Sequence, residues 1–264
     1  MDLQLNNKTA LVTGSTSGIG FAITELLAQE GSTVIIHGSS AEGVQKSIQK
    51  INSNNPSAKL IAGAADLSCK SEIDALIRLI PKVDILVNNA GIYEVRPFAD
   101  ISDDEWLHIF NVNVMSGIRL SRHYLKPMLK QNWGRILFIS SESGLQIPKE
   151  MIHYGMTKAA QLAVARGIAE ATAGTNITVN SVLPGPTSSE GVLEFVKNLA
   201  KEQNKSSEQI EKEFFETVRP SSLLKRFTKP EEVAKMVTFL CSPLSSATNG
   251  ASVRVDGGVV RSIG

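Results

Sequence analysis

Residues 12–31 read VTGSTSGIGFAITELLAQEG, an apolar run that turns through three glycines into an amphipathic helical pattern. Glycines at such a turn allow backbone N–H groups to approach a pyrophosphate, and the start of the following helix adds partial positive charge. Glycines that end a strand for steric reasons alone are the alternative. Because Gly14, Gly18 and Gly20 stand between a predicted strand and a predicted helix, which Gly31 ends, we expect this loop to bind a dinucleotide.

Short apolar runs alternate with helical runs along the whole chain. The runs are apolar throughout instead of alternating, which is typical of a parallel sheet covered by helices on both faces, and the segments between them have the length of β–α–β crossovers. We therefore predict an α/β fold, a doubly wound, Rossmann-type parallel sheet of about seven strands in three layers. The predicted strands are residues 8–14, 32–38, 59–66, 83–91, 134–140, 176–185 and 252–258.

The 264 residues fit a single dinucleotide-binding and catalytic domain over 1–264. One region, residues 186–229, is charged and helix-prone, as in GVLEFVKNLAKEQ and SSEQIEKEFFETV. We interpret it as an insertion that forms a lid near the substrate, and a surface helical excursion is the alternative.

The composition favours a small-molecule partner. The 27 basic and 26 acidic side chains leave a formal charge of +1, which provides no electrostatic footprint for nucleic acid or an anionic membrane. The start, MDLQLNNKTA, lacks the pattern of a signal peptide, and no window has the length of a membrane span, so we expect a cytoplasmic protein. Cys69 and Cys241 lack metal or redox spacing, and the four histidines show no ligand spacing, so no metal site is predicted.

The end of the second strand bears on the type of dinucleotide. An acidic residue there would hydrogen-bond the adenosine ribose and repel a 2′-phosphate. VIIHGSS offers Gly38, Ser39 and Ser40 instead, which favours NADP(H) over NAD(H), with the hydroxyls and His37 as phosphate contacts, although no Arg or Lys stands there. After the third strand, Asp66 fits an acceptor for the adenine amino group, a helix cap, or both.

Residues 151–160, MIHYGMTKAA, place Tyr154 and Lys158 four apart on one face of a predicted helix. A free phenol has a pKa near 10, and bringing it near 7 takes about 4 kcal/mol. An ammonium buried beside it, together with a cationic nicotinamide, would supply that stabilisation. A chance pair on a solvated helix face is the alternative, and the pair indicates a proton-transfer site only together with the glycine loop and the polar residues of other segments.

Polar residues from two other segments are candidates for the same site. FISSESG, at the end of the fifth strand, supplies Ser140, Ser141 and Ser143, which either hold a substrate oxygen or simply form a turn. Asn111 and Asn113 lie inside a long predicted helix, where Asn is unfavourable, so we expect one of the two to have a particular polar task.

Together these motifs resemble the single-domain form of the short-chain dehydrogenase/reductase family over almost the whole chain. The resemblance rests on TGSTSGIG (13–20), NNAG (88–91), Asn113, Ser141, YGMTK (154–158), PGPT (184–187) and the segment from RFTKPEEV to VDGG (226–258).

The resemblance implies a catalytic tetrad. Tyr154 would be the general acid/base, and Lys158 would bind the nicotinamide ribose and lower the pKa of the phenol. Ser141 would orient the substrate oxygen, and Asn113 would hold a water in a proton relay. Thr13 is the family's structural threonine. With the glycine loop, the implied cofactor contacts are Gly14, Ser15, Thr16, Ser17, Gly18, Ile19, Gly20, Ser39, Asp66, Leu67, Asn88, Ala90, Gly91, Tyr154, Lys158, Pro184, Gly185 and Thr187.

Some residues depart from the family pattern. Ser17 and Ser39 stand where NADP-using relatives often carry basic residues, so the choice of cofactor stays open. Glu142, directly after the catalytic serine, is either a substrate contact or a solvated loop charge. The segment between PGPT and PEEV is longer than in the acyl carrier protein ketoreductases, which weakens the transfer of their substrate to this chain.

The expected activity is NAD(P)(H)-dependent interconversion of a secondary alcohol and a ketone, as in a 3-oxoacyl or other ketone reductase. A dinucleotide-binding sensor without turnover is the alternative, and the glycine spacing disfavours an epimerase or dehydratase. The substrate stays open among an acyl thioester, a sugar or polyol, a steroid-like alcohol and a small ketone. The predicted pocket wall comprises Tyr93, Glu94, Gln146, Ile147, Met151, His153 and the 186–229 insertion, although His153 is better explained as a packed or capping residue.

The resemblance also implies a homo-oligomer, either a tetramer or a dimer. Its interfaces would use the C-terminal segment ASVRVDGGVVRSIG and the helix that contains VNVMSGIRLSRHYLKPML.

Overall fold

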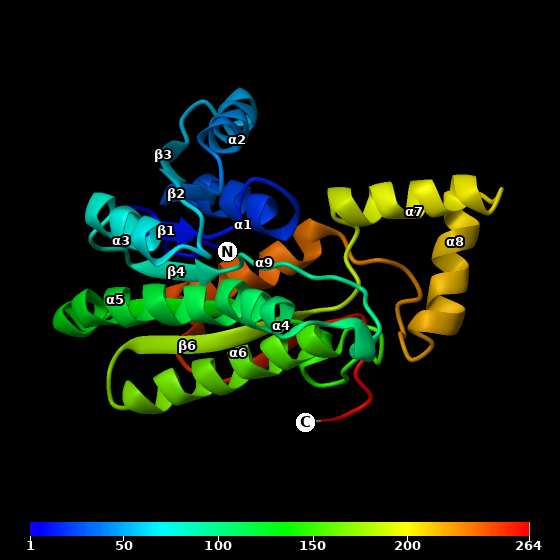
Figure 1. Cartoon of the computed structure of the whole chain (residues 1–264). Coiled ribbons are helices and arrows are strands. Elements are labelled where there is room, and N and C mark those ends of the chain that lie inside the picture. The colour runs from blue at the N-terminus through cyan, green and yellow to red at the C-terminus, as the bar shows by residue number, and fades with distance from the viewer. Residues whose placement is uncertain (264) are drawn as a thin grey trace.

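Seven parallel strands form one sheet in the computed structural model, which describes residues 1–263 (Figure 1). The strand order is β3-β2-β1-β4-β5-β6-β7. Each strand lies inside one of the seven predicted ranges, so the predicted doubly wound sheet is confirmed. The strands are β1 (Thr9–Val12), β2 (Thr33–Gly38), β3 (Lys59–Ala64), β4 (Ile85–Asn88), β5 (Gly134–Ile139), β6 (Ile177–Pro184) and β7 (Ser252–Val255).

Helices pack on both faces of the sheet and complete the three layers (Figure 1). One face carries α1 (Gly18–Gln29), α2 (Ala41–Asn54) and α9 (Pro230–Cys241). The other face carries α3 (Lys70–Leu79), α5 (Ser116–Gln131) and α6 (Ile152–Ala171), with α4 (Asp103–Phe110) ahead of α5.

Neighbouring residues of the central strands supply two separate hydrophobic cores. In β1, Ala10 and Val12 pack against α1 and α9, whereas Leu11 packs against the helices of the opposite face. All three are fully buried. This explains why the central strands are apolar at every position.

The two edge strands depart from that pattern. Exposed residues include Lys59 and Ile61 of β3 and Ser252 and Arg254 of β7. The edge strands are therefore less completely covered than the central strands, within the predicted sheet that carries helices on both faces.

The segment predicted as one long helix across residues 106–120 contains a π-helical turn, Asn111–Met115, between α4 and α5. Such turns widen the helix by one residue and often lie at functional sites. The Asn111 side chain leaves the helix and donates to the Ser68 carbonyl at 2.6 Å. The turn thus gives both asparagines of this stretch a polar task, where one was expected.

The 186–229 segment forms two helices, α7 (Glu190–Glu202) and α8 (Ser207–Glu213), followed by a π-helical turn, η4 (Phe214–Val218). Figure 1 shows α7 and α8 standing out from the body of the molecule. The two ends of the segment meet where Thr187 pairs with Thr228, whose hydroxyl oxygens lie 2.9 Å apart, and further contacts such as that of Ser221 with Val259 join the segment to the body. Its helices enclose a small hydrophobic cluster of their own around Phe215.

No helix within residues 1–263 is both long and apolar enough to cross a membrane.

Tyr124 on α5 offers a test of the packing beneath the sheet. Its ring is fully buried, and its hydroxyl donates to the Ile80 carbonyl at 2.8 Å. We expect Tyr124→Phe to lower the free energy of unfolding by about 1–2 kcal/mol, because the carbonyl loses its buried donor. Urea unfolding measures this change, with Tyr93→Phe as control because the Tyr93 side chain is largely exposed. Equal free energies of unfolding of the two variants would contradict a stabilising role for the hydrogen bond between Tyr124 and Ile80.

Candidate active site

A cavity of about 610 Å³ runs along the carboxyl edge of the sheet. The glycine loop, the ends of β2 and β4, and the start of α6 all contribute to its wall. Most of the predicted site residues therefore meet in one place. Those in the lining are Gly14, Thr16, Ser17, Ile19, Gly20, Ser39, Asp66, Leu67, Ala90, Gly91, Ser141, Tyr154, Lys158, Pro184, Gly185 and Thr187.

The glycine loop leaves room that side chains would fill. Gly14 has a φ of 61°, and a Cβ atom there would lie 2.9 Å from the Ala90 Cα. A Cβ atom on Gly20 would lie 2.3 Å from the Gly14 carbonyl oxygen and 2.5 Å from Asn89 Nδ2. Such contacts are shorter than van der Waals distances, so only glycine fits. The bare loop at the start of α1 fits the pyrophosphate of a dinucleotide.

Thr13 joins this loop to the end of β4. Its Oγ1 accepts from the backbone N–H groups of Asn89 and Ala90, each at 2.9 Å. In return, Asn89 Nδ2 donates to the carbonyls of Thr13 and Gly14, each at 2.9 Å. These four bonds fix the two turns that form the central part of the cavity, which agrees with the structural role expected of Thr13.

At two predicted cofactor contacts the side chains serve the protein's own framework, and the contacts themselves stay predictions. The Ser15 hydroxyl is fully buried and accepts from the His37 N–H at 2.9 Å. The Asn88 amide faces away from the cavity and donates to Ser121 Oγ at 3.2 Å. Its neighbour Asn89 lies in the cavity lining instead. Gly18 is also outside the lining, although its φ of 54° shapes the loop.

His37 lines the cavity, and its role as a phosphate contact stays a prediction. Its ring is buried, and Nδ1 accepts from the Gly14 N–H at 3.1 Å. Burial lowers the pKa of His37 to about 4, so the ring is neutral at physiological pH. His37 therefore supports the glycine loop instead of carrying a positive charge toward a phosphate.

Asp66 lies at the same end of the cavity as Ser39. Its carboxylate accepts from the Ser68 N–H at 2.8 Å, which holds the pKa of Asp66 below its usual value. The helix-cap interpretation is wrong, because α3 has Cys69 as its N-cap and Asp66 lies three residues earlier. The carboxylate is exposed and open to a ligand.

Tyr154 and Lys158 lie on the first turns of α6. The Lys158 Nζ donates to the Ile139 carbonyl at 2.9 Å and to Gln161 Oε1 at 3.3 Å, and it lies 5.4 Å from the centre of the Tyr154 ring. Burial lowers the pKa of Lys158 to about 8, although Glu142 opposes this effect. The ammonium is thus held in place by the protein and is easier to deprotonate than a surface lysine.

The pKa of Tyr154 is raised above its ordinary value, first by burial and then by the negative charge of Glu142. The side-chain interaction with Ser141 and the positive charge of Arg219 act in the opposite direction. The protein alone therefore keeps the phenol protonated. The lowering of the pKa expected from Lys158 does not overcome burial in the protein by itself.

Asn113 is almost fully buried and uses both ends of its amide within the protein. Oδ1 accepts from the Ile92 N–H at 2.8 Å, and Nδ2 donates to the Ile92 carbonyl at 2.9 Å and to Thr157 Oγ1 at 3.0 Å. Its carbonyl accepts from Gln161 Nε2 at 2.6 Å. Asn113 thus joins the π-helical turn, the loop after β4 and α6, and its role in a water relay stays a prediction.

Glu142 is buried, so its interpretation as a solvated loop charge is wrong. Its carboxylate accepts a hydrogen bond from the Ser141 hydroxyl. His153 is packed, as expected, with its ring centre 5.9 Å from that of Trp106. Of the other predicted wall residues, Tyr93 lines the cavity, and the 186–229 segment contributes Ser189 and Val192.

Several residues near the site were not identified from the sequence. Gln161 stands three residues after Lys158, on the same helix face, and this spacing was the available signal. His108 and Val112 line the cavity from the other side of Asp66. Nothing local in the sequence indicated them, because they come from α4 and the following π-helical turn, away from the strand ends.

Comparisons with known proteins agree with this geometry. The model of the short chain dehydrogenase family matches residues 8–203. The chain is 48% identical to the uncharacterized oxidoreductase YvaG of Bacillus subtilis (strain 168), over 100% of both chains. It is 36% identical to the 3-oxoacyl-[acyl-carrier-protein] reductase FabG of Aquifex aeolicus (strain VF5), over 98% of this chain and 100% of the relative.

Among solved structures, the chain is similar to L-sorbose reductase from Gluconobacter frateurii, complexed with NADPH and L-sorbose. The TM-score is 0.94 with 27% identity, and the match covers 100% of both chains. The chain therefore belongs to the short-chain dehydrogenase family, as its motifs predicted, and is an oxidoreductase that acts on CH–OH and C=O groups with a nicotinamide cofactor.

Proposed function

We propose that this protein is an NADP(H)-dependent reductase that converts a neutral, hydroxylated ketone into a secondary alcohol. The observation that carries the proposal is the position of Tyr154 and Lys158 in the same cavity as the glycine loop. This arrangement brings an acid/base pair to the end of a dinucleotide site, as carbonyl reduction requires.

When bound, the nicotinamide supplies the hydride. Tyr154, kept protonated by burial, donates the proton to the carbonyl oxygen of the substrate. Lys158 holds a positive charge beside the phenol and stabilises the tyrosinate that forms. Ser141 orients the substrate oxygen, for which its hydroxyl has to turn from Glu142 toward the carbonyl.

The charge around the cavity favours a neutral substrate. Among the described lining residues, Lys158 is the only Lys or Arg, and its ammonium already donates to the Ile139 carbonyl and to Gln161. Arg219, from the 186–229 segment, lies close by but is paired with Glu142 and Glu150. A carboxylate substrate would find no free cation, whereas a hydroxylated ketone would meet the hydroxyl groups of Tyr93, Ser189 and other residues.

The solved L-sorbose reductase supports a ketose or polyol, and the FabG relative supports a 3-oxoacyl thioester. We favour the ketose or polyol because Ser189, the N-cap of α7, adds a hydroxyl group to the cavity wall close to that of Tyr93. In this proposal the 186–229 segment acts as the lid over the substrate.

The absence of a carboxylate at the end of β2 supports NADP(H) over NAD(H). Ser17 and Ser39 line the cavity there, and Asp66 is the only Asp or Glu among the described lining residues. Hydroxyl groups can bond a 2′-phosphate without repelling it, although they add no positive charge.

A substrate panel with both cofactors tests the proposal. We expect L-sorbose or a related ketose to oxidise NADPH faster than acetoacetate does, and NADPH to have a higher kcat/KM than NADH. The measurement is the loss of nicotinamide absorbance, with the Tyr154→Phe variant as control. Binding of NADPH without turnover of any member would favour a dinucleotide sensor. Reduction of an acetoacetyl thioester alone would favour the 3-oxoacyl activity.

A further inference from the structure

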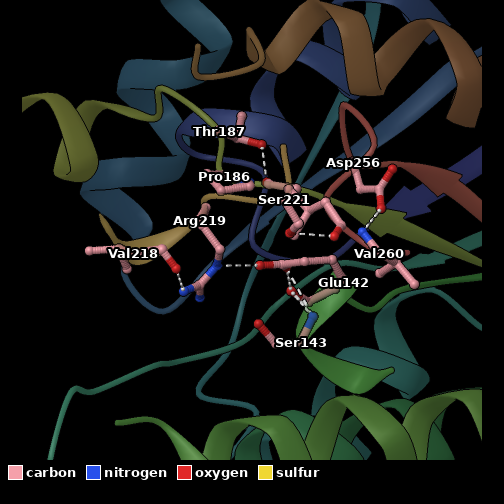
Figure 2. Close-up of polar contacts among 12 residues, drawn as sticks. Glu142, Ser143, Pro186, Thr187, Val218, Arg219, Ser221, Asp256 and Val260 are labelled. Carbon is pink, nitrogen blue, oxygen red and sulfur yellow. Dashed lines mark hydrogen bonds and ion pairs between the residues drawn. The ribbon is translucent and has the colours of Figure 1, made fainter. Parts of the chain in front are cut away.

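A buried ion pair lies directly beside the proposed acid. Glu142 belongs to a short 3₁₀ turn after β5, and its side chain is only 6% exposed. One carboxylate oxygen, Oε1, accepts from Arg219 Nε at 3.2 Å. The other, Oε2, accepts from the Ser143 N–H at 3.0 Å and from the Ser141 hydroxyl. Figure 2 shows the Arg219 guanidinium directed at this carboxylate, with Ser143 on its other side.

Arg219 comes from a distant part of the chain, immediately after η4 in the 186–229 segment. Its side chain is 13% exposed, and its Nη1 also lies 3.4 Å from Glu150 Oε1. A single guanidinium thus bridges two carboxylates of the loop that leads into α6. Burying Glu142 without this partner would leave an uncompensated charge, which is strongly unfavourable.

The hydrogen bond that Glu142 accepts from Ser141 determines which partner the serine proton has. A serine hydroxyl has one proton, and here that proton is directed to the Glu142 carboxylate. Ser141 Oγ also accepts from the Ser143 N–H at 3.1 Å. Glu142 therefore holds the Ser141 hydroxyl in place before a substrate binds, and the hydroxyl turns from this carboxylate when it orients the substrate oxygen.

Charged and titratable groups reach Tyr154 from four elements. Lys158 lies on the same helix, Tyr93 comes from the loop after β4, Glu142 from the turn after β5, and Arg219 from the end of η4. Glu142 raises the pKa of Tyr154, and Arg219 lowers it. Because the two charges shift the pKa of Tyr154 in opposite directions, their electrostatic effects on the phenol partly cancel.

We propose that Arg219 is a positioning residue for the reaction: it holds Glu142 against Ser141 and offsets the charge of that carboxylate at the Tyr154 hydroxyl. The inference rests on the proposed function, because it assigns Arg219 a role in proton transfer by Tyr154. It also connects the 186–229 segment to the chemistry. Displacement of the last turn of that segment would remove the cation and leave the carboxylate unbalanced beside the phenol.

Two substitutions test this inference, one that removes the negative charge of Glu142 and one that removes the positive charge of Arg219. The measurement is the pH profile of alcohol oxidation, in which Tyr154 must accept a proton. We expect Glu142→Gln to move the midpoint of the rise in kcat to lower pH by about half a pH unit or more, because a negative charge is lost. We expect Arg219→Gln to move it by a similar amount to higher pH. Arg219→Lys, which keeps the charge, should lie between Arg219→Gln and the unmodified protein.

Glu170→Gln is the matched control, because Glu170 forms an exposed ion pair with Arg166 away from the cavity. Its profile should coincide with that of the unmodified protein. Shifts of Glu142→Gln and Arg219→Gln in the same direction, or no shift in either, would overturn the inference.

Hydrogen exchange separates this inference from the proposed function. In Arg219→Gln, the peptide that contains the Ser143 amide should exchange faster, because its acceptor Glu142 is no longer held. This readout needs no turnover. If the protein reduces no ketone at all, the proposed function fails, and exchange at Ser143 still decides whether Arg219 positions Glu142. Unchanged exchange in Arg219→Gln would contradict the positioning role.

Discussion

Tyr154→Phe is expected to lower kcat for ketone reduction by a factor of about 10²–10⁴, the usual contribution of a general acid. The phenol is the acid that lies in the cavity beside Lys158 and Ser141, and burial keeps it protonated. Removing the hydroxyl leaves the ring and its packing in place. The affinity for NADPH should therefore change by less than about threefold, because a phenylalanine ring preserves the shape of the site.

Stopped-flow measurement of hydride transfer and titration of NADPH fluorescence check these two results separately. Tyr93→Phe is the control for loss of a phenol from the same cavity, since its hydroxyl has no assigned part in proton transfer. Retention of more than about a tenth of the original kcat in Tyr154→Phe would remove Tyr154 from the role of general acid.

Gly20→Ala should weaken NADPH binding by about 10- to 100-fold, that is by about 1–3 kcal/mol, because the added methyl group overpacks the glycine loop. The new Cβ atom would lie 2.3 Å from the Gly14 carbonyl oxygen and 2.5 Å from Asn89 Nδ2. Both atoms belong to the framework that fixes the loop. To make room, the loop has to move away from β4, and the cradle for the pyrophosphate loses its shape.

Gly167→Ala is the matched substitution. Gly167 lies within α6, and a Cβ atom there would meet nothing within 4 Å. We expect unchanged NADPH affinity and a free energy of unfolding higher by about 0.5–1 kcal/mol, because alanine favours the helix. Isothermal titration gives the affinities, and thermal unfolding shows whether each variant is folded. Equal affinity of folded Gly20→Ala and Gly167→Ala would argue against the glycine loop as the cofactor site.

The strands and the general position of the site could be predicted because their signals are local. An apolar run followed by glycine or serine marks a buried strand and its end, and parallel strands bring these ends to one edge. The glycine loop follows β1 and Ser141 follows β5, and Tyr154 lies on the helix that comes after β5. These residues meet in one cavity because of the topology of the sheet, and the alternation of strands and helices in the sequence already indicated that topology.

The sequence does not give the direction in which a side chain points, and this direction decides which residues enter the cavity. Asn88 and Asn89 are neighbours at the end of β4, and the last residue of a strand points opposite to the next, so only Asn89 enters the cavity. His37 was interpreted by its chemistry, yet its burial makes it neutral. Arg219 was missed because its partner Glu142 is 77 residues away in sequence, and no local pattern connects the two.

The π-helical turn at Asn111–Met115 also constrains how the length of this chain can vary. One residue of an α-helix corresponds to a rotation of about 100°. The extra residue allows Asn113 to face α6 while Tyr124, further along, still faces Ile80 beneath the sheet. A chain shorter by one residue in this turn could keep one of these orientations but not both. Insertions and deletions are therefore excluded from this stretch far more strictly than substitutions, and its residue count is itself part of the active-site geometry.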